Sequence, residues 1–95
     1  MYARLIQMQA SPSDFDGIMS VLKERVAPAV RQLPGCKMDY FAGDRDQGRL
    51  VSFVLFEDKA GTEAAEALFQ QMAPQVKNLG LRFDSVENLE VLIGS

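Results

Sequence analysis

The chain contains no histidine and no tryptophan among its 95 residues. Without histidine it lacks the side chain that most readily exchanges a proton near neutral pH and the commonest side-chain ligand of transition metals. We therefore expect no metal site, and any catalysis must depend on other groups.

Cysteine is almost absent as well, since Cys36 is the single example. One cysteine excludes an intramolecular disulfide and suits a reducing cytosol. No apolar run reaches the roughly 18 residues that suggest a membrane span. Residues 1–9 also lack the basic and then apolar pattern of a secretory signal. We expect a cytoplasmic protein with no membrane partner.

Positively charged residues are fewer than negatively charged ones: the chain has 10 Lys and Arg residues and 13 Asp and Glu residues, which gives a net charge of −3. Nucleic-acid binding draws most of its non-specific affinity from basic patches, so we expect no nucleic-acid partner. The length and the apolar content of 47% suit one globular domain spanning residues 1–95.

An internal repeat is the most informative feature that is present. Residues 26–33 (VAPAVRQL) recur as residues 72–79 (MAPQVKNL), nearly half a chain later. Only two copies exist, so the repeat predicts one domain built from two equivalent halves rather than a solenoid.

Hydrophobic periodicity assigns the same elements to both halves. Strands are predicted at 2–9, 36–42, 49–56 and 88–93, the last starting near Val86; helices are predicted from the Ser11–Asp14 segment to about 32 and from about 62 to 78, with a hairpin turn at 43–48. The order βαββαβ predicts an α+β, ferredoxin-like fold with both helices on one face of an antiparallel sheet.

Pro28 and Pro74 interrupt the two predicted helices at equivalent positions. A proline removes a backbone hydrogen bond and clashes with the carbonyl four residues earlier, so each helix should bend. We interpret the bends as curvature over a twisted sheet; the alternative is a freed carbonyl that lines a pocket.

The strand at 49–56 is apolar on both faces, which helices on one side of a sheet cannot explain. One set of side chains is Leu50, Ser52, Val54 and Phe56, and the other is Val51, Phe53 and Leu55. We predict a homodimer through the sheet faces, with the second set as the dimer face, although the pattern leaves open which set packs on the helices. The alternative cover is a C-terminal segment folded over the sheet.

Two polar residues are candidates for binding a small ligand. Tyr40, expected on the same strand face as Cys36 and Met38, has a hydroxyl that can bond a phenol or quinol between sheet and helices. Its alternative role is that of a half-buried strand tyrosine. Arg4 can hold an anionic group, or it can pair with a carboxylate such as Glu57 or Glu90, or lie at the dimer edge.

Other reactive residue types favour structural roles. Cys36 follows a helix C-terminus, whose dipole raises a thiol pKa. Asp44 and Asp46 lack the further ligands of a calcium loop and suit a turn. Glu63 and Glu66 are expected on the solvated side of the second helix.

The run 49–56 (RLVSFVLF) also resembles the RNP1 strand of RNA-recognition domains, which share the βαββαβ order. Arg49, Phe53 and Phe56 fit that pattern. Leu50 replaces its glycine and Val51 replaces a stacking aromatic residue, so RNA binding is disfavoured.

The sequence also resembles the antibiotic biosynthesis monooxygenase-like family of dimeric α+β barrels. The resemblance rests on residues 26–30 (VAPAV), on 33–36 (LPGC) opening a strand, and on 55–58 (LFED) before an alanine-rich helix. It implies a homodimer and a monooxygenase, without a cofactor, for an aromatic or quinol-type molecule. A small-ligand-binding or stress-related homodimer of the same fold is the alternative.

Two departures from that family narrow the activity. Members often carry tryptophan near Phe56 and histidine near Ala65 or Glu66, and this chain has neither. Haem-degrading relatives use an Asn, His and Trp set, so the resemblance does not extend to haem degradation.

Overall fold

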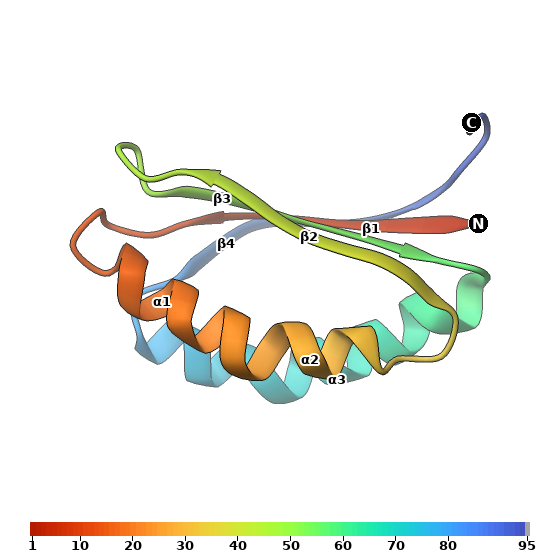
Figure 1. Cartoon of the computed structure of the whole chain (residues 1–95), viewed down its shortest axis with the longest axis horizontal. Coiled ribbons are helices and arrows are strands. Elements are labelled where there is room, and N and C mark those ends of the chain that lie inside the picture. Colours follow the sequence, from red (N-terminus) through yellow and green to blue (C-terminus); the bar gives the residue numbers. More distant parts are fainter. Residues whose placement is uncertain (95) are drawn as a thin grey trace.

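The computed structural model describes residues 1–94 as one four-stranded sheet with helices on one of its faces (Figure 1). Its elements are β1 (Tyr2–Gln9), α1 (Phe15–Val21), the π-helical turn η1 (Leu22–Val26), α2 (Ala27–Arg31), β2 (Cys36–Asp44), β3 (Arg49–Phe56), α3 (Lys59–Asn78) and β4 (Arg82–Glu90). Because α1, η1 and α2 follow one another without a break, they make a single first helix.

The strand order is β2-β3-β1-β4, and all three neighbouring pairs are antiparallel. The first helix and α3 cover one face, and the other face is uncovered (Figure 1). The predicted ferredoxin-like α+β fold is confirmed. None of the helices in residues 1–94 combines the length and the apolar character that crossing a bilayer requires.

Strand β3 shows which of its two apolar sets faces the helices. Leu50, Ser52, Val54 and Phe56 are 1%, 4%, 4% and 0% exposed, and they point toward the helices. The alternate set, Val51, Phe53 and Leu55, is half-buried on the uncovered face, which we call the open face. The set under the helices is therefore fully buried, and the set on the open face is only partly buried.

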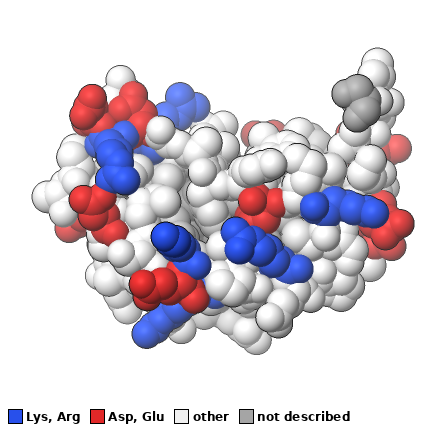
Figure 2. Space-filling view, in the orientation of Figure 1, with Lys and Arg blue, Asp and Glu red and all other residues white. Residues whose placement is uncertain are grey.

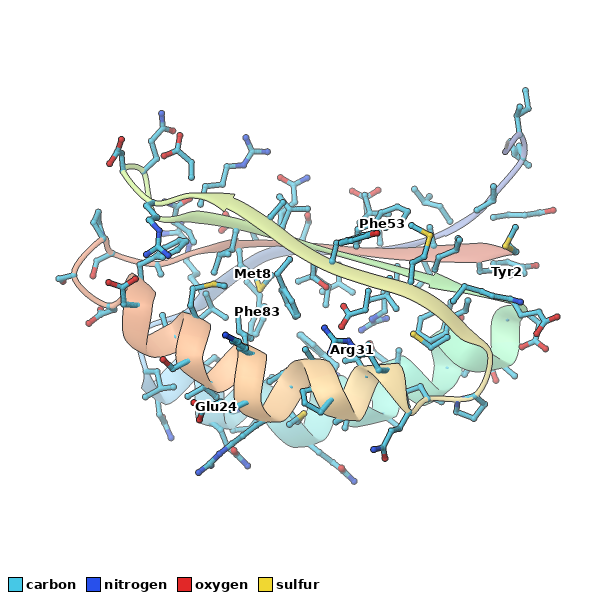
Figure 3. The ribbon with its side chains drawn as sticks, in the orientation of Figure 1. Tyr2, Met8, Glu24, Arg31, Phe53 and Phe83 are labelled. Carbon is cyan, nitrogen blue, oxygen red and sulfur yellow. The ribbon has the colours of Figure 1, made fainter. Side chains whose placement is uncertain are left out.

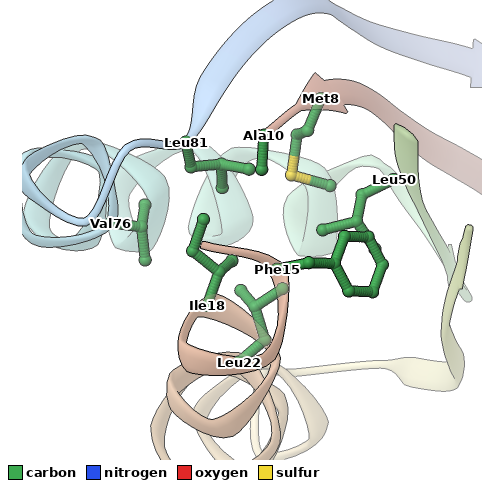
Figure 4. Close-up of a cluster of buried hydrophobic side chains, with 8 residues drawn as sticks. All are labelled: Met8, Ala10, Phe15, Ile18, Leu22, Leu50, Val76 and Leu81. Carbon is green, nitrogen blue, oxygen red and sulfur yellow. The ribbon is translucent and has the colours of Figure 1, made fainter. Parts of the chain in front are cut away.

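A cluster of apolar side chains fills the end of the molecule at which α1 begins (Figure 4). Its buried members are Met8, Ala10, Phe15, Ile18, Leu22, Leu50, Val76 and Leu81. Six of them come from β1, the first helix, β3 and α3, and Ala10 and Leu81 come from connecting segments. Removing this apolar surface from water therefore holds both helices against the sheet.

Two predicted element boundaries were wrong. The second helix begins at Lys59 rather than near residue 62, and Gly61 in its first turn packs so closely on Phe56 that a Cβ there would lie 2.4 Å from Cδ1 of Phe56. The final strand is Arg82–Glu90 rather than 88–93, because Gly80, with φ of 101°, reverses the chain directly after α3.

The two repeats accommodate their prolines differently. In the first helix Pro28 is the second residue after η1, and the N–H of Ala27, between them, donates to the Leu22 carbonyl five residues earlier. In the second half Pro74 lies inside α3, which stays α-helical from Lys59 to Asn78. The repeat is therefore not carried through to the backbone geometry of the two helices.

Candidate functional site

An apolar cavity of about 70 Å³ lies between the helices and the sheet. Most of its wall is hydrocarbon, sulfur or aromatic ring, from Ile6, Met8, Leu22, Val26, Val30, Phe41, Val54, Ala65, Leu68, Phe69, Met72, Ala73, Val76, Leu81 and Phe83. Figure 3 shows Met8 and Phe83 pointing from the sheet into this layer, whereas Phe53 lies on the open face. Concave apolar sites with few polar groups are typical of small-molecule binding.

Two polar residues, Arg4 and Ser52, complete the wall. Arg4 is 2% exposed, so its charge is almost fully removed from water. Its Nη1 donates to Asn88 Oδ1 at 3.1 Å and its Nη2 donates to Glu66 Oε2 at 2.5 Å. The guanidinium also lies 5.5 Å from the centroid of the Phe69 ring. These contacts hold a cation at a fixed place in an apolar wall.

Glu66 is the carboxylate that balances Arg4, although its side chain is 49% exposed. The hydrogen bond from Arg4 is the main reason why the pKa of Glu66 lies below its usual value, and a hydrogen bond from Gln70 adds to it. The sequence predicted that Glu66 lies on a solvated surface, and its side chain is indeed exposed. It suggested Glu57 or Glu90 as partners of Arg4, however, and missed the pairing of Arg4 with Glu66.

The π-helical turn shapes the same wall. Leu22 and Val26, the first and last residues of η1, both line the cavity. A π turn inserts an extra residue into the helical repeat and is frequent at functional sites. The alternative interpretation of Pro28 was that a freed carbonyl, that of Glu24, lines a pocket; Glu24 is not among the residues that line this cavity.

Tyr40, the second predicted ligand-binding residue, lies away from this cavity. It is 60% exposed and pairs in register with Phe53 on the open face. The expectation that Cys36, Met38 and Tyr40 share one strand face was wrong, because a bulge between Cys36 and Met38 shifts the register. The structure thus brings Arg4 to the cavity and leaves Tyr40 on the opposite side of the sheet.

The same bulge turns Asp39 toward the helices. Its carboxyl group is 1% exposed, and within residues 1–94 neither of its oxygens has a hydrogen-bond partner. The nearest cation is Arg31 on α2, whose Nε lies 3.9 Å from Asp39 Oδ2. Burial raises the pKa of Asp39, and Arg31 opposes that rise. The sequence pattern missed Asp39.

Cys36 has a raised thiol pKa, as the sequence predicted, but for a different reason. Desolvation is the largest cause and the charge of Asp39 is the second, whereas Arg31 lowers the pKa. A raised thiol pKa disfavours the nucleophilic thiolate, so Cys36 does not qualify as a nucleophile.

The hairpin aspartates serve the turn. Asp44 Oδ1 accepts hydrogen bonds from the backbone N–H groups of Asp46 and Gln47. Over the described part of the chain, no three Cys, Asp or Glu side chains gather closely enough to hold a metal ion. On the face shown in Figure 2, acidic and basic side chains alternate without forming a basic patch, which gives no support to nucleic-acid binding.

Sequence comparison alone finds no relative, since no family model and no curated protein matches the chain. Solved structures do share its fold. A Deinococcus radiodurans protein assigned as an antibiotic biosynthesis monooxygenase superposes with a TM-score of 0.85 at 17% identity, covering 100% of this chain and 96% of that one.

Two further structures have the same architecture. SnoaB, a cofactor-independent oxygenase from Streptomyces nogalater, gives a TM-score of 0.73 at 14% identity, covering 98% of this chain and 94% of its own. A dimeric ferredoxin-like protein from an uncultured marine organism gives 0.76 at 10% identity, covering 100% and 98%. At these identities the likeness is one of fold, and at that level the resemblance predicted from the sequence is confirmed.

Proposed function

We propose that the protein is a cofactor-independent monooxygenase that acts, as a homodimer, on an aromatic or quinol-type small molecule held in the cavity. The buried guanidinium of Arg4 in an otherwise apolar wall carries this proposal. An apolar cavity binds a ring, and a fixed cation in its wall favours a ring whose oxygen bears negative charge. SnoaB, which has this fold, is an oxygenase of the cofactor-independent kind.

The chemistry needs only the substrate, O2 and proton transfers. Loss of the hydroxyl proton spreads the electron pair of a phenol onto a ring carbon, and that carbon forms a bond to O2. Loss of water from the resulting hydroperoxide leaves a carbonyl group. A ring CH2 and O2 thereby become C=O and H2O, so the substrate supplies all the electrons. The protein contributes fixed charge and exclusion of water.

Arg4 is the residue that we assign to the substrate oxygen. A guanidinium carries five N–H donors, and the bonds to Asn88 and Glu66 use two of them. The remaining donors can meet a phenolate oxygen on the cavity side. Because Asn88 and Glu66 already fix the group, little reorganisation is needed when the charge develops.

The cavity must enlarge to take such a substrate. Its volume is about 70 Å³, whereas a cavity of about 150 Å³ is known to hold one benzene ring. Met8 and Met72 lie in the wall, and methionine is unbranched and adapts readily to new shapes. We expect these two side chains to move when a ring binds.

The homodimer part of the proposal rests on the open face. Val51, Phe53 and Leu55 are joined there by Tyr40 and by Met38, which is 41% exposed. Apolar surface of this kind, with no helix over it (Figure 1), suits a second copy packed sheet against sheet. One of the proteins that share the fold is dimeric.

Oxygen consumption tests the catalytic proposal. Chelator-treated, flavin-free protein is mixed with anthrone and with 1,4-dihydroxynaphthalene, and O2 uptake and product mass are recorded. We expect one oxygen atom in the product, and a loss of about 100-fold in kcat/KM for Arg4→Gln. Arg82→Gln, which changes an arginine that is 71% exposed on β4, is the matched control and should keep the wild-type rate.

The alternative is a homodimer that binds a ligand without turnover. It is favoured if the panel consumes no O2 while the same compounds raise the melting temperature of the protein. Both results together would contradict the monooxygenase proposal and keep the cavity as a binding site.

A further inference from the structure

Asp39 and Arg4 lie in one row across the sheet. In the strand register Asp39 is opposite Val54, Val54 is opposite Arg4, and Arg4 is opposite Asn88. Directly opposed residues of antiparallel strands share a face, so the whole row points toward the helices. Asp39 and Arg4 are two strand spacings apart, which is about 10 Å between their Cα atoms.

The cavity lies beside this row. Arg4 and Val54 line it, and so do Phe41, two residues beyond Asp39 on the same strand face, and Val30, the residue before Arg31. Asp39 does not itself line the cavity, but Val54, opposite it, and Phe41, on its own strand, do. A ligand that enlarged the cavity toward β2 would meet its carboxyl group.

The buried carboxyl group of Asp39 lacks hydrogen-bond donors and a close cation. Both oxygens are inaccessible to solvent, and in the described structure neither accepts a hydrogen bond. Its nearest cation, Arg31, is beyond hydrogen-bond distance at 3.9 Å, and the Arg31 side chain is 66% exposed. Leaving such a buried acceptor without a hydrogen bond costs free energy. A bound ligand with a hydrogen-bond donor would remove that cost.

The surroundings identify the chemistry of that donor. Arg31 from α2 is the charged group that acts on Asp39, and Asp39 in turn raises the pKa of the Cys36 thiol on β2. That thiol is directed to the Met38 carbonyl, at 3.9 Å, and does not donate to Asp39. Apart from Arg4 and Ser52, the cavity wall is apolar. A neutral hydroxyl on an aromatic ring supplies one donor and otherwise only apolar surface.

We propose that Asp39 is the proton acceptor of the cavity and takes the hydroxyl proton of a phenol-type ligand that packs against Val54. The ligand O–H bond breaks and an O–H bond forms on the carboxyl group, so the charge moves from Asp39 to the phenolate. Arg4 stabilises the negative charge of the deprotonated ring through a ring oxygen that lies within its reach. The proton then leaves Asp39 for solvent by way of the exposed Arg31. This inference rests on the proposed function, because a deprotonated ring is what reacts with O2.

Burial supports this role, since it raises the pKa of Asp39 and so makes it a stronger base than an exposed aspartate. Among the side-chain carboxylates of residues 1–94, Asp39 alone is buried without a hydrogen-bond partner. Glu66, beside Arg4, has a lowered pKa and already accepts hydrogen bonds from Arg4 and Gln70. The helix-covered face of the sheet thus carries a cation in the cavity wall and a base beside the cavity.

A matched pair of ligands tests the inference without requiring turnover. 4-Chlorophenol carries the hydroxyl donor and 4-chloroanisole, its methyl ether, does not. We expect the wild-type protein to bind the phenol at least tenfold more tightly than the ether at neutral pH. Asp39→Asn should reduce that ratio to about threefold or less, and the exposed-turn control Asp46→Asn should keep it. Equal binding of both ligands, no binding of either, or an unchanged ratio in Asp39→Asn would overturn the proposal.

A pH series on the wild-type protein keeps the test decisive if Asp39→Asn fails to fold. The preference for the phenol should fall as the pH is lowered through the titration of Asp39, because a protonated carboxyl group no longer takes the proton; a constant preference would contradict the proposal. Oxygen uptake separates the two proposals. A preference for the phenol without O2 uptake supports Asp39 as the proton acceptor and contradicts the monooxygenase proposal. O2 uptake at an unchanged rate in Asp39→Asn contradicts only the role of Asp39.

Discussion

Glu66 on α3 forms a salt bridge of 2.5 Å with the buried guanidinium of Arg4 on β1, although the glutamate itself is half in water. The pair thus joins an interior charge to the surface of the protein. Exposed ion pairs contribute little to stability, but here the guanidinium is buried and has no water to replace the glutamate. Substituting Glu66 should therefore lower the stability of the protein more than the exposure of this residue suggests.

We expect Glu66→Gln to lower the free energy of unfolding by about 1–2 kcal/mol, less than for a fully buried pair because Glu66 is partly hydrated. The matched control is Glu63→Gln, which changes an exposed glutamate in the same helix and should have almost no effect. Urea denaturation of the three proteins measures the difference. Equal stability of all three would contradict a supporting role for Glu66.

The contribution of Glu66 should depend on pH with a definite sign. Its pKa is lowered in the folded state from an ordinary value of 4.5. The stabilisation is therefore complete above that value and is lost as the pH falls through the folded pKa. The difference in the free energy of unfolding between wild type and Glu66→Gln should become smaller in acid. A difference that grows in acid would refute the stabilising role of ionised Glu66.

The two helix prolines should differ in their cost. Pro74 interrupts regular α-helix, where a proline costs about 3 kcal/mol and restricts the unfolded chain by up to about 1 kcal/mol in compensation. We expect Pro74→Ala to raise the free energy of unfolding by about 2 kcal/mol. Pro28→Ala should gain less than half as much, because η1 already accommodates the ring. Denaturant unfolding of both variants measures the gains, and equal gains would show that η1 relieves nothing.

The open face gives a prediction about solution mass. We expect a species of about twice 10.5 kDa. Phe53→Asp places a charge in the centre of the proposed interface and should weaken self-association about 100-fold or more, equivalent to about 3 kcal/mol. Gln71→Asp, on the exposed side of α3, should leave the mass unchanged. Sedimentation at low micromolar concentration decides, and a monomeric wild type would refute the dimer.

Cys36 reports on the charge of Asp39. Desolvation and that charge both raise the thiol pKa from an ordinary value of 9.0, so the thiol should react slowly with iodoacetamide at neutral pH. Asp39→Asn removes one of the two causes and should speed the reaction severalfold, whereas Asp46→Asn should not. Mass spectrometry of the alkylated protein gives both rates. A slower reaction in Asp39→Asn would reverse the proposed sign of the interaction.

Local pattern was sufficient for the fold and insufficient for the site. The alternation of Arg49–Phe56 and the helical stripes predicted the sheet and both helices, because those signals act within one element. The pairing of Arg4 with Glu66 joins residues far apart in the chain. It depends on how α3 lies across β1, which no local pattern contains.

A single irregularity explains the remaining failure. The bulge between Cys36 and Met38 reverses the faces of the residues that follow it, so Tyr40 turns outward and Asp39 turns inward. Strict alternation assigns the opposite sides. The bounds of β4 were missed for another reason: its first half is largely polar, and an edge strand needs no continuous apolar pattern.

The central position of β1 has a consequence for how the chain acquires its structure. Its two neighbours are β3 and β4, so its pairing with β4 must wait until residues 82–90 have been made. Asn88, which accepts a hydrogen bond from Arg4, lies on β4, 84 residues along the chain from that arginine. Because pairings between distant residues form slowly, we expect the cavity and its cation to be assembled together in a late step of folding.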